Sequence, residues 1–321
     1  MRNKQVWQES LHLASFFHPA GMRIEHPGQE PPQASKHSGP CLPDFRTCCV
    51  KPKPSMPQRL NHKHHKEDHT LRVRVKFAKY GPMKFIGHLE LMRYLQSAVR
   101  RTEIPVKYDE GMHQRMVMSF AMPLGVGPTS SAEYMDIELV EPISSEKAMR
   151  QLKEHMCEGL DILDFREVDG AKKQKAMTIV AAADYEVSFR EGFEPDWDWK
   201  SALSEFCARE TIPWVKETKK GTREVDMKEW IYEMRCDKGA VPQSPSVQSV
   251  GACETTPDTV YLRLCCSVGD NLKPEQLFGE MFRSYGHELP RFALQVHRLD
   301  LLTRDEAGEF VSLGELGERI P

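Results

Sequence analysis

The 321-residue sequence lacks long apolar runs and has no strong excess of charge of either sign. Its longest clean apolar run, residues 179–183, falls far short of the roughly 18 residues that a membrane helix requires. The formal net charge of −3 excludes a uniformly basic nucleic-acid-binding protein, although it leaves room for a local basic surface. Hydrophobic residues at 40% and charged residues at 28% are ordinary for a globular protein. We therefore expect a globular protein with no membrane association.

The cysteines lack the spacing of a disulfide framework or a zinc site. There are nine, an odd number, and they include two adjacent pairs but no Cys-x-x-Cys sequence. A secretory signal is also not indicated, because His12 interrupts the apolar residues 11–17. We therefore expect a reducing, cytoplasmic location, no bound metal and no cofactor.

Residues 1–69 lack the regular apolar pattern from which a hydrophobic core could form. They hold nine of the 22 prolines and eight of the 13 histidines, with no sustained period of 2 or 3.6. This composition predicts a disordered extension. Its histidine tract at 62–65, with His69 nearby, has a residue type that binds transition metals, but the interleaved lysines favour a solvated tail.

The pattern changes at Leu71, where apolar residues begin to alternate with Arg72, Arg74 and Lys76. This alternation indicates a half-buried strand with a basic outer face. The periods that follow predict the order strand, helix, strand, strand, helix, strand, which is the ferredoxin-like (split βαβ) arrangement. The predicted strands are 71–77, 116–122, 134–139 and 160–168, and the predicted helices are 87–101 and 144–157.

Similar elements recur beyond a polar connector near residue 172. We expect strands at 178–189, 260–268 and 291–302, a strand-like segment at 213–225 with a turn at Gly221, and helices at 200–209, 226–236 and 274–285. Residues 237–257 are rich in Pro, Ser, Gln and Gly and indicate an insertion loop. The fold class is therefore α+β, with two tandem ferredoxin-like units on antiparallel sheets at 70–172 and 176–304 and a C-terminal tail at 305–321.

Several motifs in these elements resemble one family. The first is Phe77-x-Lys79-x-Gly81-Pro82-x-x-Phe85-Ile86-x-His88-Leu89-Glu90-Leu91-Met92-Arg93. It is followed by Gly111, Ser119-Phe120, Pro123-Leu124-x-Val126-Gly127 and Glu133-Tyr134-x-Asp136-Ile137-Glu138-Leu139, then by Val225-Asp226-x-Lys228 and His297-Arg298-Leu299. Together they resemble the bacterial radical SAM-linked (radical SAM-associated) domain of unknown function in its stand-alone form, over residues 71–302.

This resemblance implies an association with RNA metabolism. Members of that family occur alone or behind a cobalamin-binding radical SAM protein, in bacterial gene neighbourhoods that hold a ribonuclease of the E/G type and ribosomal protein genes. The chain departs from the family at Gly111-Met112-His113-Gln114, where an aromatic residue and a proline are usual, and Glu90 stands for a usual Asp. It also contains no Cys-x-x-x-Cys-x-x-Cys motif, so radical SAM chemistry would have to come from a partner.

The charge distribution singles out the segment that carries the first motifs. Residues 71–115 hold ten lysines and arginines against four acids, whereas residues 116–321 hold 24 against 37. Cations there can neutralise RNA phosphates, and tyrosines can stack on bases. Besides the strand cations Arg72, Arg74 and Lys76, the candidate RNA- or anion-binding residues are His88, Arg93, Arg100, Arg101, Lys107, Tyr108 and Arg115.

A structural explanation competes with RNA binding for the strand cations. In a split βαβ sheet the first and third strands are neighbours, so Arg72, Arg74 and Lys76 can oppose the segment Tyr134 to Glu138 and form cross-strand ion pairs. The helix and loop cations are therefore the better candidates. His297-Arg298 is also open to two interpretations: a contact across the junction of the units, or a core strand with one outward arginine.

His88 is the best single candidate for catalysis. It lies at a predicted helix start beside Gly87, where anions are readily held, and with Tyr108 and His113 it could serve acid–base cleavage of RNA. The alternative is a hydrogen-bonded structural histidine between Ile86 and Leu89. The sequence therefore does not assign a catalytic residue.

Three functions remain open. The leading expectation is an accessory protein of the radical SAM-linked family that acts with a separate radical SAM partner in RNA metabolism or modification. The alternatives are a metal-independent RNA-processing enzyme that uses His88, and a protein–protein adaptor without nucleic-acid binding. Sequence-specific DNA binding is not expected.

Overall fold

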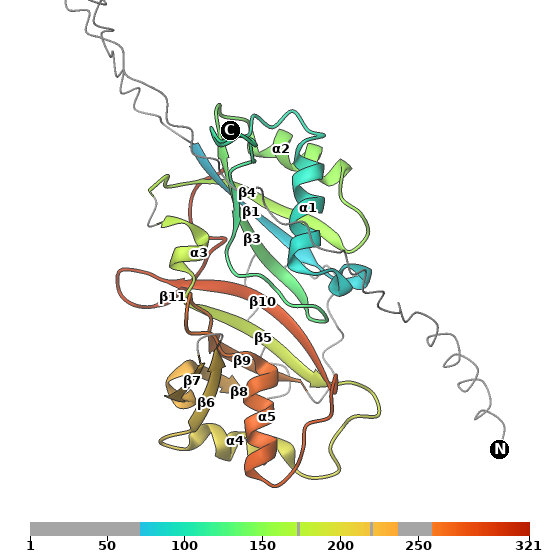
Figure 1. Cartoon of the computed structure of the whole chain (residues 1–321), viewed down its shortest axis with the longest axis vertical. Coiled ribbons are helices and arrows are strands. Elements are labelled where there is room, and N and C mark those ends of the chain that lie inside the picture. The colour runs from blue at the N-terminus through green and yellow to red at the C-terminus, as the bar shows by residue number, and fades with distance from the viewer. Residues whose placement is uncertain (1–70, 172–173, 219–220, 237–258) are drawn as a thin grey trace, which may run out of the picture. The chain divides into compact units, whose positions relative to one another are not determined.

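The computed structural model describes residues 71–171, 174–218, 221–236 and 259–321, all of which belong to one structural unit. The expected extension at 1–69, its histidine tract and the insertion loop at 237–257 lie outside the described residues. The described chain has a mixed α+β fold with one large, mostly antiparallel sheet of nine strands and few helices (Figure 1). None of the helices in this part of the chain is long and apolar enough to cross a membrane.

The first half follows the predicted order of elements. The order of its strands in the sheet is β4-β1-β3, and β2 pairs with β3. All of these pairs are antiparallel. The elements are β1 (Leu71–Lys79), the 3₁₀ helix η2 (Gly81–Phe85), α1 (His88–Val99), β2 (Met118–Phe120), β3 (Thr129–Leu139), α2 (Ser145–Glu154) and β4 (Leu160–Val168).

The second half orders its main strands as β10-β5-β9-β8, again antiparallel, and adds a separate two-stranded sheet, β6-β7. Its elements are α3 (Ala176–Ile179), β5 (Ala182–Phe189), α4 (Trp199–Ala208), β6 (Pro213–Thr218), β7 (Gly221–Asp226), η4 (Met227–Trp230), β8 (Ile231–Arg235), β9 (Val260–Cys265), α5 (Pro274–Ser284), β10 (Leu294–Arg304) and β11 (Phe310–Ser312).

The helix predicted at 226–236 is wrong. Asp226 accepts a hydrogen bond from the backbone N–H of Lys228 (2.9 Å), which caps only the short η4. The chain then extends as β8, where Arg235 pairs with Tyr261 of β9. Backbone pairing with a neighbouring strand therefore overrides a weak helical pattern, as tertiary context commonly does.

The two halves share the sheet through β3 and β10. These strands run parallel and pair over two positions, Thr129 with His297 and Ser130 with Arg298. Two apolar clusters fill the space between sheet and helices, one under α1 and α2 and one under α4 and α5. Burying a large apolar side chain contributes roughly 1.5–3 kcal/mol, so the clusters hold the helices firmly on the sheet.

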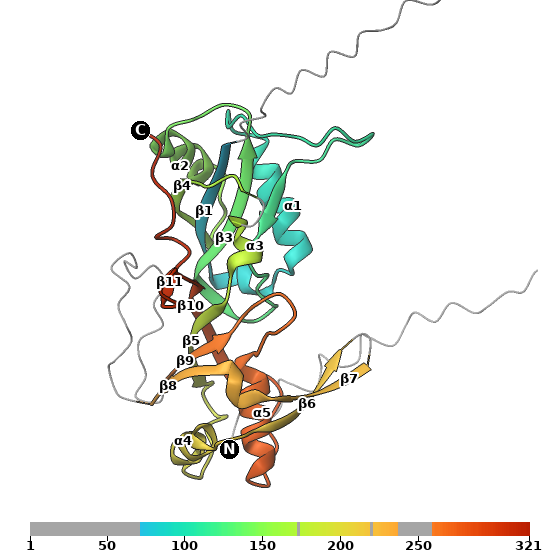
Figure 2. The same ribbon diagram turned by 90° about the vertical axis from the view of Figure 1, so that its left-hand side faces the viewer.

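The outer face of β1 is buried, which corrects the expectation of a half-buried strand. Arg72, Arg74 and Lys76 are at most 5% exposed. Part of the cover is the segment after β10, which was expected to be a tail at 305–321. There, β11 pairs with β10, Glu318 exchanges backbone hydrogen bonds with Glu167 of β4, and residue 320 hydrogen-bonds α2 (Figure 2). We call residues 310–320 the C-terminal strap.

Candidate functional site

The outer face of α1 carries two exposed cations from the predicted set. Leu91, Leu95 and Val99 point into the core, so the opposite side of the helix faces solvent. Arg93 and Arg100 lie on this exposed side, and neither has an ion-pair partner among the described residues. The neighbouring Arg101 is also exposed and donates to the carbonyl of Ser97 (3.3 Å).

The other predicted cations lie on a projecting loop, residues 107–117, which we call the arm (Figure 2). Backbone hydrogen bonds hold its two sides together, from Asp109 to Arg115 (2.9 Å) and from Val117 to Lys107 (2.9 Å). Tyr108 is 38% exposed, Arg115 is exposed, and Lys107 is partly buried. Gly111 lies near the tip of the arm. The arm is thus a polar projection with one accessible aromatic ring.

The cations of β1 are paired within the sheet, which confirms the predicted pairing with β3 for Arg72 and Arg74 but not for Lys76. Arg72 lies 3.5 Å from Glu138, and Arg74 donates to Asp136 at 2.8 Å. Lys76 lies 3.8 Å from Asp300 of β10. Because these pairs are buried, the strand cations do not form an open surface for phosphates.

His88 is the first residue of α1 and is partly buried. Its ring packs edge-on against Phe120, with 5.1 Å between the ring centroids. Burial lowers the pKa of His88, although the nearby Glu133 partly opposes this effect. The contacts found in the described residues do not join His88 to Tyr108 or His113, so the predicted acid–base group is not assembled.

A buried ionic cluster lies near His88. Arg298 of β10 donates to Glu133 of β3 through Nε (2.8 Å) and through Nη2 (2.5 Å), and both side chains are at most 5% exposed. Lys79 of β1 donates to the carbonyls of Ile86 (3.0 Å) and Gly125 (3.4 Å). Burial lowers the pKa of Lys79. Lys79 thus ties the segment just before His88 to the loop that contains Gly125.

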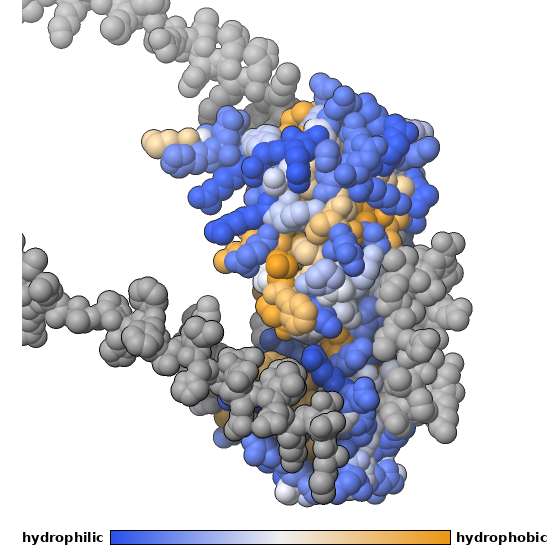
Figure 3. Space-filling view, turned by 90° about the vertical axis from the view of Figure 1, so that its right-hand side faces the viewer, coloured by the Kyte–Doolittle hydropathy of each residue, from blue (hydrophilic) through white to orange (hydrophobic). Residues whose placement is uncertain are grey.

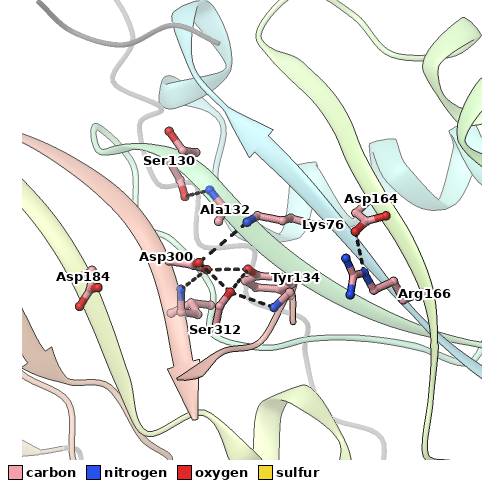
Figure 4. Close-up of polar contacts among 12 residues, drawn as sticks. Lys76, Ser130, Ala132, Tyr134, Asp164, Arg166, Asp184, Asp300 and Ser312 are labelled. Carbon is pink, nitrogen blue, oxygen red and sulfur yellow. Dashed lines mark hydrogen bonds and ion pairs between the residues drawn. The ribbon is translucent and has the colours of Figure 1, made fainter. Parts of the chain in front are cut away.

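A second buried cluster joins Tyr134, Asp300 and Ser312 (Figure 4). Because side chains alternate along a strand, Tyr134 points to the opposite face of the sheet from its neighbour Glu133. The Tyr134 hydroxyl donates to Asp300 (2.5 Å), and the Ser312 hydroxyl donates to the other oxygen of that carboxylate (2.7 Å). Burial raises the pKa of both Tyr134 and Asp300. Sequence reasoning singled out Tyr134 but missed Asp300 and Ser312, because no local spacing links residues so far apart in the chain.

The family assignment rests on residues 72–274, which match the model of a family described as "Uncharacterized protein conserved in bacteria (DUF2344)". The chain belongs to this family. No curated protein matches the chain. The part that matches the DUF2344 family ends before β10, so Arg298, Asp300 and Ser312 complete clusters whose other members lie inside it.

In this member of the DUF2344 family, the motif residues lie on different elements of the fold. Gly81, with a φ of +52°, begins η2 together with Pro82. Phe85 ends η2 and is 64% exposed. Ser119 of β2 pairs directly with Asp136 of β3. The structure thus brings Ser119 and Asp136 together with Arg115, and all three line a cavity of about 320 Å³.

Proposed function

We propose that the protein is an RNA-binding accessory protein that carries out no chemistry of its own. The observation that supports this best is the contrast between two sets of cations. Those of β1 are buried in ion pairs, whereas Arg93 and Arg100 lie exposed on one helix without ion-pair partners in the described part of the chain. When exposed arginines of this kind neutralise phosphates, the RNA releases the counterions that were bound to those phosphates, and this release favours binding.

Exposed apolar side chains near the start of α1 add an apolar surface that bases can contact. Phe85 is 64% exposed, Leu89 56% and Val126 61%. The backbone N–H of Gly127 donates to the carbonyl of Lys84 (2.8 Å), which holds the Val126 loop against η2. Figure 3 shows the face that carries α1, where apolar side chains lie among hydrophilic ones. Aromatic rings next to arginines are typical of single-stranded RNA recognition.

The radical SAM partner belongs to the same proposal. It is supported by the resemblance of the motifs to the radical SAM-linked domain and by the lack of a cluster-binding cysteine motif in the sequence. We propose that the partner carries the cluster and that this chain presents the RNA to it. The proposed setting is RNA metabolism or modification in the bacterial cytoplasm.

We also propose that the two halves are tandem ferredoxin-like units. When the main strands of each half are numbered along the chain, their order across the sheet is 4-1-3-2 in both: β4-β1-β3-β2 in the first half and β10-β5-β9-β8 in the second. The β6-β7 hairpin is then an insertion after the first helix of the second unit. Under this interpretation the units span 70–172 and 176–304.

The test is a titration of the full-length protein with single-stranded RNA at several salt concentrations. Removing one arginine that neutralises a phosphate should flatten the plot of log affinity against log salt by about 0.7. We expect the double substitution Arg93→Ala, Arg100→Ala to weaken binding and to flatten this slope. Arg291→Ala is the matched control, because Arg291 is also exposed but lies in the second half. Binding that is absent, insensitive to salt, or equally weakened by the control would overturn the proposal.

A further inference from the structure

The cavity of about 320 Å³ lies between the arm and the sheet. Met116, Met118 and Phe120 belong to the core under α1 and α2. Because side chains alternate along an extended chain, Val117 and Ser119 point to the other face of the sheet. The cavity therefore opens on the face opposite to α1 and α2.

The charges around the cavity are balanced. Arg72, Arg115 and Lys175 face Asp109, Asp136 and Glu138. A bare anion such as inorganic phosphate would meet three carboxylates there. A ligand that offers both hydrogen-bond donors and acceptors fits the lining better, and a nucleobase has both on its edge.

Glu138 is a lining carboxylate with unused hydrogen-bonding capacity. Its side chain is 17% exposed, and its nearest cations are Arg72 at 3.5 Å and Lys175 at 3.9 Å. Neither distance is that of a well-formed hydrogen bond. No hydrogen bond from the described residues reaches the Glu138 carboxylate. By contrast, the Asp136 carboxylate already accepts three hydrogen bonds, two from Arg74 and one from the backbone N–H of Ala176 (2.7 Å).

We infer that this cavity binds one nucleobase of the RNA, with Glu138 accepting hydrogen bonds from the base edge and Arg115 placed for the attached phosphate. A guanine suits Glu138 best, because its adjacent N1–H and N2–H groups match the two oxygens of a carboxylate. The volume lies at the small end of ligand sites, which span roughly 300–1,000 Å³, and so suits a single base. The inference rests on the proposed RNA binding and names the part of the RNA that the site reads.

The experiment measures binding of GMP, AMP, CMP and UMP to the full-length protein by calorimetric titration. We expect GMP to bind most tightly. Glu138→Gln should weaken GMP binding by about tenfold or more, because it removes a charged acceptor. Ser119→Phe should abolish GMP binding by filling the cavity. Arg291→Ala should leave GMP binding unchanged, because Arg291 is exposed in the second half and is not part of the cavity lining.

The outcomes separate this inference from the proposed function. The inference is overturned if the wild type binds no mononucleotide, or if Glu138→Gln and Ser119→Phe, both with wild-type thermal unfolding midpoints, bind GMP as the wild type does. Salt-dependent RNA binding without mononucleotide binding would overturn the inference and leave the proposed function standing. Binding of GMP with the expected reductions in the variants, but no binding of RNA, would support the cavity as a nucleotide site and overturn the RNA-binding role.

Discussion

Arg298 of β10 and Glu133 of β3 form a buried, bidentate ion pair at the place where the two halves of the chain join in one sheet. The strands pair over only two backbone positions there, so the side chains supply much of the connection. Arg298 also donates to the carbonyl of Met122 (2.8 Å). Both His297 and Arg298 thus contact β3 of the first half, in agreement with the interpretation of this motif as a contact between the two halves of the chain.

Removing Arg298 should destabilise the protein strongly. Arg298→Met leaves Glu133 as a buried charge without its partner, and such a change typically costs about 3–5 kcal/mol in the free energy of unfolding. Urea unfolding monitored by circular dichroism measures it. Arg283→Ala is the control, because it removes an exposed pair with Glu280 that should contribute less than about 1 kcal/mol. Similar destabilisation of both variants would contradict the prediction.

The buried His297 should make the protein less stable in mild acid. Its ring lies between the hydroxyls of Thr129 and Ser131 (both 2.7 Å), and burial lowers its pKa to about 4. Below the unfolded value near 6.5 the unfolded chain binds a proton that the folded chain does not. Folding stability therefore falls as the pH decreases from about 6.5 to 4, by roughly 3 kcal/mol for this group.

His297→Gln isolates this effect from other titrating groups. Denaturant unfolding of wild type and variant should be measured at several pH values between 4 and 7. The stability difference between the two proteins should shift in favour of the variant as the pH falls. A difference that stays constant with pH would show that His297 does not titrate in this way.

Gly159 should tolerate substitution far less than Gly269. Both have a left-handed backbone, with φ of +91° and +103°, so an alanine at either place costs about 1–2 kcal/mol in strain. A Cβ at Gly159 would also lie 2.5 Å from the carbonyl oxygen of Tyr80, whereas Gly269 has open space. Thermal unfolding should therefore show a clearly larger destabilisation for Gly159→Ala, and equal effects would refute the steric argument.

Substitution of His88 should not change what happens to RNA that is incubated with the protein. If the protein has no chemistry of its own, wild type and His88→Ala should give the same products after incubation with RNA. A general acid or base contributes about 10²–10⁴-fold to a rate, so gel analysis of labelled RNA would reveal a catalytic role readily. Cleavage by the wild type that the variant does not perform would favour the enzyme and overturn the non-catalytic proposal.

Local patterns predicted the elements of the first half well. The alternation in β1 and the helical spacing in α1 are set by neighbours a few residues apart, and the structure has both at nearly the expected positions. The cross-strand pairing of Arg74 with Asp136 also followed from the predicted sheet order. In each case the partner could be found from a repeat or a neighbouring strand.

Long-range partners could not be predicted in this way. β8 is a strand because β9 pairs with it, and η4 ends after Trp230. The partners of Tyr134 lie on β10 and β11, and no sequence spacing connects them. The C-terminal strap was missed because its few apolar residues have no regular period, although Leu313 is fully buried.

The position of β10 has a consequence for the order of folding. This strand comes after β5 and β9 in the chain, yet it lies between β3 and β5 in the sheet. Until β10 is synthesised, one edge of β5 has no partner strand and β3 lacks its partners at residues 129–130. Over the same period Glu133 and Tyr134 lack Arg298 and Asp300. We therefore expect the nascent first half to depend on chaperones until residues 294–304 leave the ribosome.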